Sequence, residues 1–115
     1  MIEDQQESWM SKIRNFAPII EKAEYELFKS KADVQKINAK LKAQAIDKGF
    51  KTVSGQENYA ENQEELYQAR LLVGVKQGFL TSTKVQLEAI KVGFEEWRTK
   101  MVNKREERRR YAVSE

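Results

Sequence analysis

The chain has 115 residues, of which 34% are charged and 40% are hydrophobic, and its formal net charge is +3. It contains neither cysteine nor histidine, which excludes disulfide bonds, thiolate zinc sites and every catalytic arrangement that depends on a Cys or His side chain. With one proline and five glycines, the composition favours a single small domain of long helices over a sheet protein.

The sequence gives no sign of a targeting or membrane segment. The first ten residues, MIEDQQESWM, carry acids where a secretory signal would carry a positive charge, and no run of 18 apolar residues occurs. We therefore expect a cytoplasmic protein without a membrane partner.

A short amphipathic helix is expected at the start of the chain, over about residues 3–16. Trp9, Ile13 and Phe16 lie four and three residues apart, so all three share one face of such a helix. Pro18 follows them. Because proline is best tolerated in the first turn of a helix, a new helix is predicted to begin beside it.

The second predicted helix covers about residues 18–48 and carries a coiled-coil seam. Its apolar residues recur every seven positions: Ile20, Leu27, Val34 and Leu41. Gly49 marks the end of the helix, because glycine accepts the left-handed conformation that closes a last turn. Residues 49–54 are expected to form the turn, with Ser54 as N-cap of the next helix and Glu57 as its reciprocal capping residue.

The third predicted helix, over about residues 55–110, has the longest seven-residue repeat. Its members are Tyr59, Leu66, Val73, Leu80, Leu87, Phe94 and Met101. At ~1.5 Å per residue such a helix is roughly 80 Å long, nearly twice the length of the second helix. The short first helix is therefore expected to cover its far half. The predicted fold is an all-α, coiled-coil-like antiparallel hairpin of three helical segments in one domain.

The middle of the third helix has more apolar residues than one partner helix can bury. Leu71 and several of its neighbours lie off the main seam. We therefore expect a homo-oligomer with the following interface residues: Leu72, Val75, Phe79, Leu80, Leu87, Phe94 and Trp97. Gly74 and Gly78 form a G-x-x-x-G pair, which either permits close approach of another helix or breaks the helix locally.

Two basic segments are candidate ligand-binding features. Residues 29–55 and 69–115 each sum to +5, and Lys22, Lys29 and Lys36 share one line along the second helix. Lysine and arginine contact nucleic-acid phosphates without reading sequence. The candidate nucleic-acid-binding residues are Lys29, Lys36, Lys40, Lys42, Lys48, Lys51, Arg105, Arg108 and Arg109. The alternative interpretation is a solvated helix face whose arginines complement the helix dipole.

No group of residues indicates catalysis, a cofactor or a metal. The carboxylates in the first turns of the third predicted helix are interpreted as partners of the helix dipole rather than as metal ligands: Glu57, Glu61, Glu64 and Glu65. Since no nucleophile with a general base is present either, we do not expect an enzyme.

Two segments of the chain resemble a known family. The lysine-rich SKADVQKINAKLKAQAIDKG, a polar turn, and QLEAIKVGFEEW together resemble the UvsY family, the recombination mediators of T-even bacteriophages. The second segment is similar to that family's Leu-x-Ala-Ile-Lys-x-x-Gly-Phe ending through Leu87, Ala89, Ile90, Lys91, Gly93 and Phe94, with one residue fewer between Lys91 and Gly93. The resemblance implies a ring-like homo-oligomer that binds single-stranded DNA and helps a RecA-type recombinase load onto strands covered by single-strand-binding protein.

The sequence leaves two functions open. One is a phage-type accessory protein, located in the host-cell cytoplasm, that binds single-stranded DNA and assists recombination or replication as a homo-oligomer. The other is a helical adaptor, scaffold or inhibitor that acts through protein–protein contacts without nucleic acid.

Overall fold

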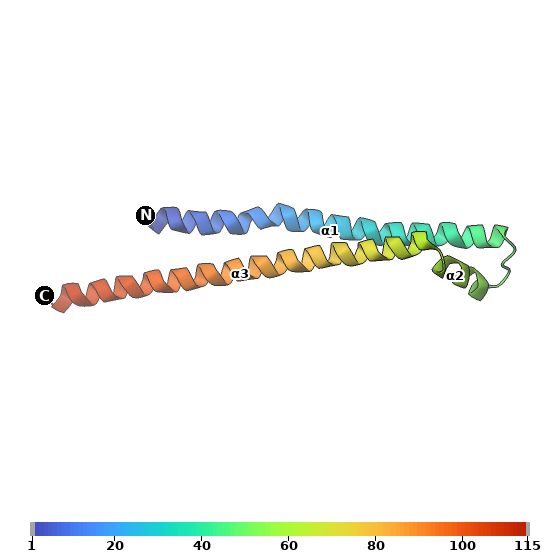
Figure 1. Cartoon of the computed structure of the whole chain (residues 1–115). Coiled ribbons are helices and arrows are strands. Elements are labelled where there is room, and N and C mark those ends of the chain that lie inside the picture. The colour runs from blue at the N-terminus through green and yellow to red at the C-terminus, as the bar shows by residue number, and fades with distance from the viewer. Residues whose placement is uncertain (1, 115) are drawn as a thin grey trace.

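The computed structural model describes residues 2–114, which form an elongated helical hairpin (Figure 1). Helix α1 covers Ile2–Asp47, α2 covers Val53–Glu61 and α3 covers Glu64–Ser114. The two long helices, α1 and α3, pack antiparallel, and α2 lies at the turn between them. The hairpin measures 94 × 20 × 16 Å, so its core is a single seam between two helices rather than a globular interior.

The predicted heptad repeats form that seam. One core cluster contains Ala23, Leu27 and Leu80, with Ile20 and Val73 packed against it. A second cluster, nearer the turn, contains Leu41, Ala60 and Leu66, with Val34 and Ile37 packed against it. The seven-residue repeat of α3 is buried or half-buried at every step from Leu66 to Met101. The all-α antiparallel hairpin predicted from the sequence is therefore confirmed.

The predicted break at Pro18 is wrong, because α1 is one helix of 46 residues with Pro18 inside it. A proline in a helix interior removes one backbone hydrogen bond and costs about 3 kcal/mol. The seam accounts for the continuity. Trp9, Ile13 and Phe16 stand in the same heptad register as Ile20, so a straight helix keeps all four against α3. The unbroken register across Pro18 is the sequence signal for a single helix.

The start of α1 covers the far half of α3, as the sequence predicts for Trp9. The Trp9 and Phe94 rings lie 6.4 Å apart between centroids, and Phe94 and Trp97 lie 6.1 Å apart. The indole Nε1–H of Trp97 donates to Gln5 Oε1 at 3.2 Å. Gly93 provides the space for this packing, since a Cβ at that position would lie 3.0 Å from Trp9 Cη2.

Glycine closes α1 in the way the sequence predicts. Gly49 takes the left-handed conformation, with φ of 97°. Its N–H donates to the Ile46 carbonyl and the Phe50 N–H donates to the Ala45 carbonyl, both at 3.0 Å. These two bonds form a Schellman motif, which satisfies carbonyl groups that the last turn of a helix otherwise leaves unpaired.

The N-cap of the next helix is Thr52, not the predicted Ser54. Thr52 Oγ1 accepts a hydrogen bond from the Gly55 N–H at 3.0 Å, so α2 begins at Val53. Gly55 fits this cap because a Cβ there would lie 3.0 Å from the same hydroxyl oxygen. The turn is also held by the side chain of Gln56, whose Nε2 donates to the Phe50 carbonyl at 3.1 Å.

The third predicted helix is not continuous, because α2 ends at Glu61 and α3 begins at Glu64. Ala60 directly follows the seam residue Tyr59, so a straight helix would carry it off the seam. The break instead places Ala60, which is fully buried, in the core cluster with Leu41 and Leu66. Burial at the turn therefore decides where the helix is interrupted.

The joint between α2 and α3 is held by a bidentate ion pair. The Arg70 guanidinium donates two hydrogen bonds to the Glu61 carboxylate, one of them from Nη2 to Oε1 at 2.6 Å. Glu61 lies in the last turn of α2, so its interpretation as a first-turn dipole partner is wrong. The two glycines considered as a possible break, Gly74 and Gly78, lie within continuous helix.

Alanine substitution separates a glycine that the hairpin needs from one that it does not. We expect Gly74→Ala to raise the free energy of unfolding by about 0.5–1 kcal/mol, because the added methyl group meets no atom within 4 Å. Gly93→Ala is the matched change, and its methyl group would press on Trp9. We expect no gain or a loss there, measured by urea denaturation. An equal gain at both sites would contradict the packing of Trp9 on Gly93.

The ion pair at the joint makes stability depend on pH. The hydrogen bonds from Arg70, with the charges of Arg70 and Lys42, hold the pKa of the Glu61 carboxyl group below its ordinary value of 4.5, against a smaller opposing effect of desolvation. A lowered pKa in the folded state contributes stability above the unfolded pKa, and this contribution disappears as the pH falls through the folded pKa. Glu61→Gln should therefore destabilise the hairpin near neutral pH and much less near pH 3.

The measurement is thermal unfolding between about pH 3 and pH 7. Glu96→Gln is the control, because Glu96 is exposed on α3 and has no ion-pair partner among residues 2–114. A difference between wild type and Glu61→Gln that stays constant across this range would contradict the expected role of the carboxylate.

Candidate nucleic-acid interface

Several of the predicted nucleic-acid-binding lysines already have partners inside the chain. Lys40 Nζ lies 3.0 Å from Glu65 Oε1 and joins α1 to α3. Lys42 is half-buried and places its charge near Glu61. Lys48 Nζ lies 5.0 Å from the centroid of the Tyr59 ring, in a cation–π contact. These three lysines therefore make contacts within the chain at the end of the hairpin near the turn.

Two other predicted lysines, Lys29 and Lys36, are exposed and form a line with Lys22. Lys22, Lys29 and Lys36, here called the lysine line, lie seven residues apart on one face of α1. None of the three has an ion-pair partner within residues 2–114. By contrast, two lysines of α3 are paired with acids of α1 at 3.7 Å: Lys76 with Glu26 and Lys84 with Glu24. At ~1.5 Å per residue the line is about 21 Å long.

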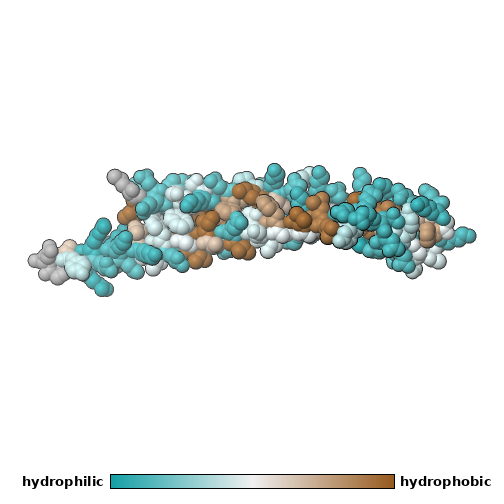
Figure 2. Space-filling view, viewed as in Figure 1, coloured by the Kyte–Doolittle hydropathy of each residue, from teal (hydrophilic) through white to brown (hydrophobic). Residues whose placement is uncertain are grey.

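An open groove lined by both apolar and polar residues runs beside the lysine line, where α1 meets α3. Figure 2 shows hydrophobic residues gathered along this junction in the middle of the molecule, with mostly hydrophilic surface toward both ends. The groove has two neighbouring hollows. One includes Ile19, Lys22, Val75 and Phe79 in its lining. The other includes Lys36 and Leu72, together with the carboxylate residue Asp33.

This arrangement combines the two elements that contact a single nucleic-acid strand. Lys22 and Lys36 line the hollows and carry charges for phosphates, while the Phe79 side chain, 55% exposed, presents an aromatic ring. Asp33 and Glu26 also line the groove and repel phosphates. Phosphate contact is therefore favoured on the outer side of α1, away from these carboxylates.

The predicted arginines lie at the other end of the molecule. Residues 98–110 are close to the C-terminal end of α3, far from the turn that carries Lys48 and Lys51 (Figure 1). Arg105 and Arg108 line a shallow hollow together with residues from the start of α1. Arg109 lies 3.8 Å from Glu106. The nine candidate cations thus form no single surface.

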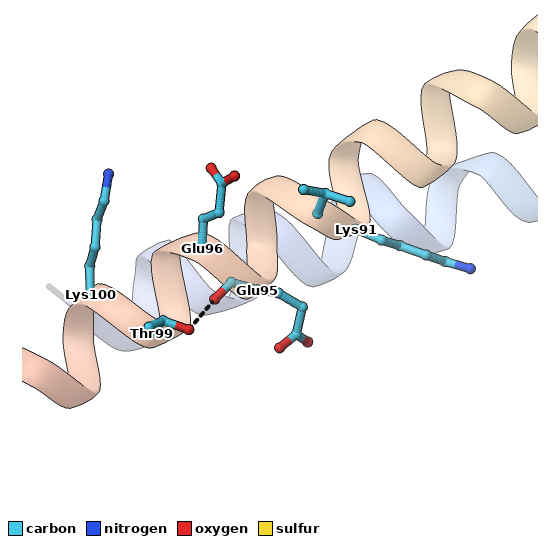
Figure 3. Close-up of a pocket in the computed structure, with 6 residues that line it drawn as sticks. Lys91, Glu95, Glu96, Thr99 and Lys100 are labelled. Atoms are coloured by element: carbon cyan, nitrogen blue, oxygen red, sulfur yellow. Dashed lines mark hydrogen bonds between the residues drawn. The ribbon is translucent and has the colours of Figure 1, made fainter.

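A further hollow lies on α3 alone and is drawn in Figure 3. Its lining residues all belong to one helix: Lys91, Val92, Glu95, Glu96, Thr99 and Lys100. The charged side chains extend outward from the ribbon, and Thr99 Oγ1 donates to the backbone carbonyl of Glu95 at 2.9 Å. The hollow is therefore an open helix face, and its lysines and glutamates do not converge on a point where a substrate would react.

The candidate oligomer interface divides into a covered part and an exposed part. Leu80 and Phe94 are buried in the seam, and Leu87 and Trp97 are half-buried in it. Three other candidates remain exposed on the surface: Leu72, Val75 and Phe79. Of the seven candidates, these are the three that a folded hairpin leaves between 45% and 65% exposed to another molecule.

Within residues 2–114, no three acidic side chains lie close enough together to hold a metal ion. None of the helices in this range combines the length and the apolar composition needed to cross a lipid bilayer.

Comparison with known proteins finds no family model, no curated protein and no solved structure that matches this chain.

Proposed function

We propose that this chain is a non-enzymatic helical protein that binds the phosphate backbone of single-stranded nucleic acid along α1. The observation that carries the proposal is the lysine line, whose three cations are exposed, evenly spaced and without a carboxylate partner in residues 2–114. Four lysines elsewhere on the hairpin are neutralised by acids, namely Lys40, Lys76, Lys84 and Lys91. The three lysines of the line are not, and their even spacing on one helix face leaves a surface that attracts an external anion.

A single strand suits this surface better than a duplex. The lysine line is straight because it follows one helix, whereas the phosphates of a duplex wind around its axis and leave such a line. A flexible single strand can place successive phosphates along the line and turn bases toward the exposed Phe79 ring in the neighbouring groove. Such contacts give affinity without sequence readout.

The resemblance to the UvsY family supports the same proposal and extends it. Under it, the chain would act as an accessory protein in phage recombination or replication, with a RecA-type recombinase and a single-strand-binding protein as partners. Single-stranded DNA would then be the ligand.

A second candidate function is a helical adaptor or scaffold that binds another protein. It is favoured by the apolar side chains exposed in the groove: Ile19, Leu72 and Phe79 are 44%, 45% and 55% exposed. Exposed apolar clusters rimmed by polar residues are typical of protein–protein contact sites. Under this alternative, the lysine line serves solubility alone.

Oligonucleotide binding as a function of salt distinguishes the two candidates. We expect the wild-type protein to bind a mixed-sequence single-stranded oligonucleotide at low salt, measured by fluorescence anisotropy. Replacing the three lysines of the line by glutamate should weaken binding and reduce the slope of log K against log salt by about two, since each phosphate contact on a single strand contributes about 0.7.

The control changes the same charge on another face of the same helix. Lys29→Glu and Lys31→Glu alter residues two positions apart, which point to different sides of α1. Lys29→Glu should weaken binding several-fold more than Lys31→Glu. Equal losses would indicate an effect of net charge alone, and absence of binding at low salt would contradict the proposed function and favour the adaptor.

A further inference from the structure

The outer face of α3 carries a second seam that α1 does not cover. Its residues are alternately four and three positions apart, as in a heptad repeat, and we call them the outer seam: Leu71, Val75, Gly78, Ser82, Val85, Ala89 and Val92. None is charged, and all are exposed in the single chain. The four larger side chains are between 47% and 65% exposed. In a chain that is 34% charged, an uncharged line of about 32 Å forms a continuous unpartnered face.

The hairpin itself does not require this composition. A Cβ added at Gly78 meets no atom within 4 Å, and the same holds for Gly74 on the edge of the outer seam. Glycine in a helix interior costs about 1 kcal/mol relative to alanine and here gains nothing inside the chain. Small residues on a helix face do permit another helix to approach closely.

We propose that α3 of a second copy of this chain packs antiparallel on the outer seam. An antiparallel coiled coil places the two alternating positions of a heptad opposite each other. With the two-fold axis level with residue 80, Leu71 faces Ala89, Val75 faces Val85 and Gly78 faces Ser82. The small pair near the axis brings the helices together, and the larger pairs fill the seam on either side.

Charge favours this direction over the parallel one. Residues 98–110 carry a net charge of +5. A parallel dimer would place the two copies of this basic segment side by side. The antiparallel dimer instead puts them at opposite ends of the pair, which removes this repulsion.

The dimer leaves the lysine line accessible. The outer seam lies on the side of α3 away from α1, so pairing of two α3 helices places both α1 helices at the outside. Of the interface residues predicted from sequence, only Val75 belongs to the outer seam. Val75 also lines the hollow that contains Lys22 and Phe79, so the two surfaces meet there. The lysine line belongs to α1 and the outer seam to α3, so replacing the lysines tests phosphate binding without changing the outer seam.

Sedimentation equilibrium tests the association. The wild-type chain is expected at twice its 13.5 kDa mass at micromolar concentration. Val75→Glu combined with Val85→Glu should give the single-chain mass, with unchanged helix content by circular dichroism, because both side chains are exposed in the hairpin. Wild-type protein at the single-chain mass throughout, or a double variant that remains dimeric, would overturn the proposal.

Disulfide formation tests the direction, and the chain has no cysteine of its own. Leu71→Cys and Ala89→Cys, each alone, should not cross-link on mild oxidation, because identical positions lie about 27 Å apart along antiparallel helices. An equimolar mixture of the two variants should form the mixed disulfide. Ala39→Cys, exposed on α1, is the control and should not cross-link with either. Cross-linking of Leu71→Cys alone would indicate a parallel dimer and overturn the proposal.

Discussion

The heptad seam between α1 and α3 is the interaction on which the rest of this structure depends. A chain with one charged residue in three has too little apolar surface for a globular core, but two lines of apolar residues suffice when each faces the other. Polar residues within the seam are accommodated locally. Ser30 and Thr83 are buried, and each donates its hydroxyl hydrogen to a carbonyl of the preceding turn at 2.8 Å.

The seam also overrides local signals that oppose helix formation. Pro18 and the three glycines of α3 each disfavour helix, yet both long helices continue through them. Leaving the register would expose every apolar residue beyond the break, whereas continuing costs one backbone hydrogen bond or some chain entropy. At Asn62 and Gln63, continuing the helix would bury no further apolar side chain. The helix breaks there, and Ala60 is buried.

These relations show how far the sequence predicts this molecule. The seven-residue repeats predict the helices and their pairing, because each repeat can be recognised within its own segment, before the partner helix is known. The N-cap could not be chosen from sequence, since Thr52 and Ser54 are both good caps and only packing of α2 at the turn selects between them. The sequence also could not show which candidate lysines are ion-paired. That depends on acids far away in the chain, as with Lys40 and Glu65.

The narrow, elongated shape of the hairpin has a mechanical consequence. The turn closed by Gly49 lies at one extreme, and both ends of the described chain lie toward the other (Figure 1). Anything held at the turn is thus kept apart from anything held near the chain ends by most of the 94 Å length. Two paired helices resist bending together more than one does, so the packing of α1 on α3 favours a constant separation between the turn and the chain ends.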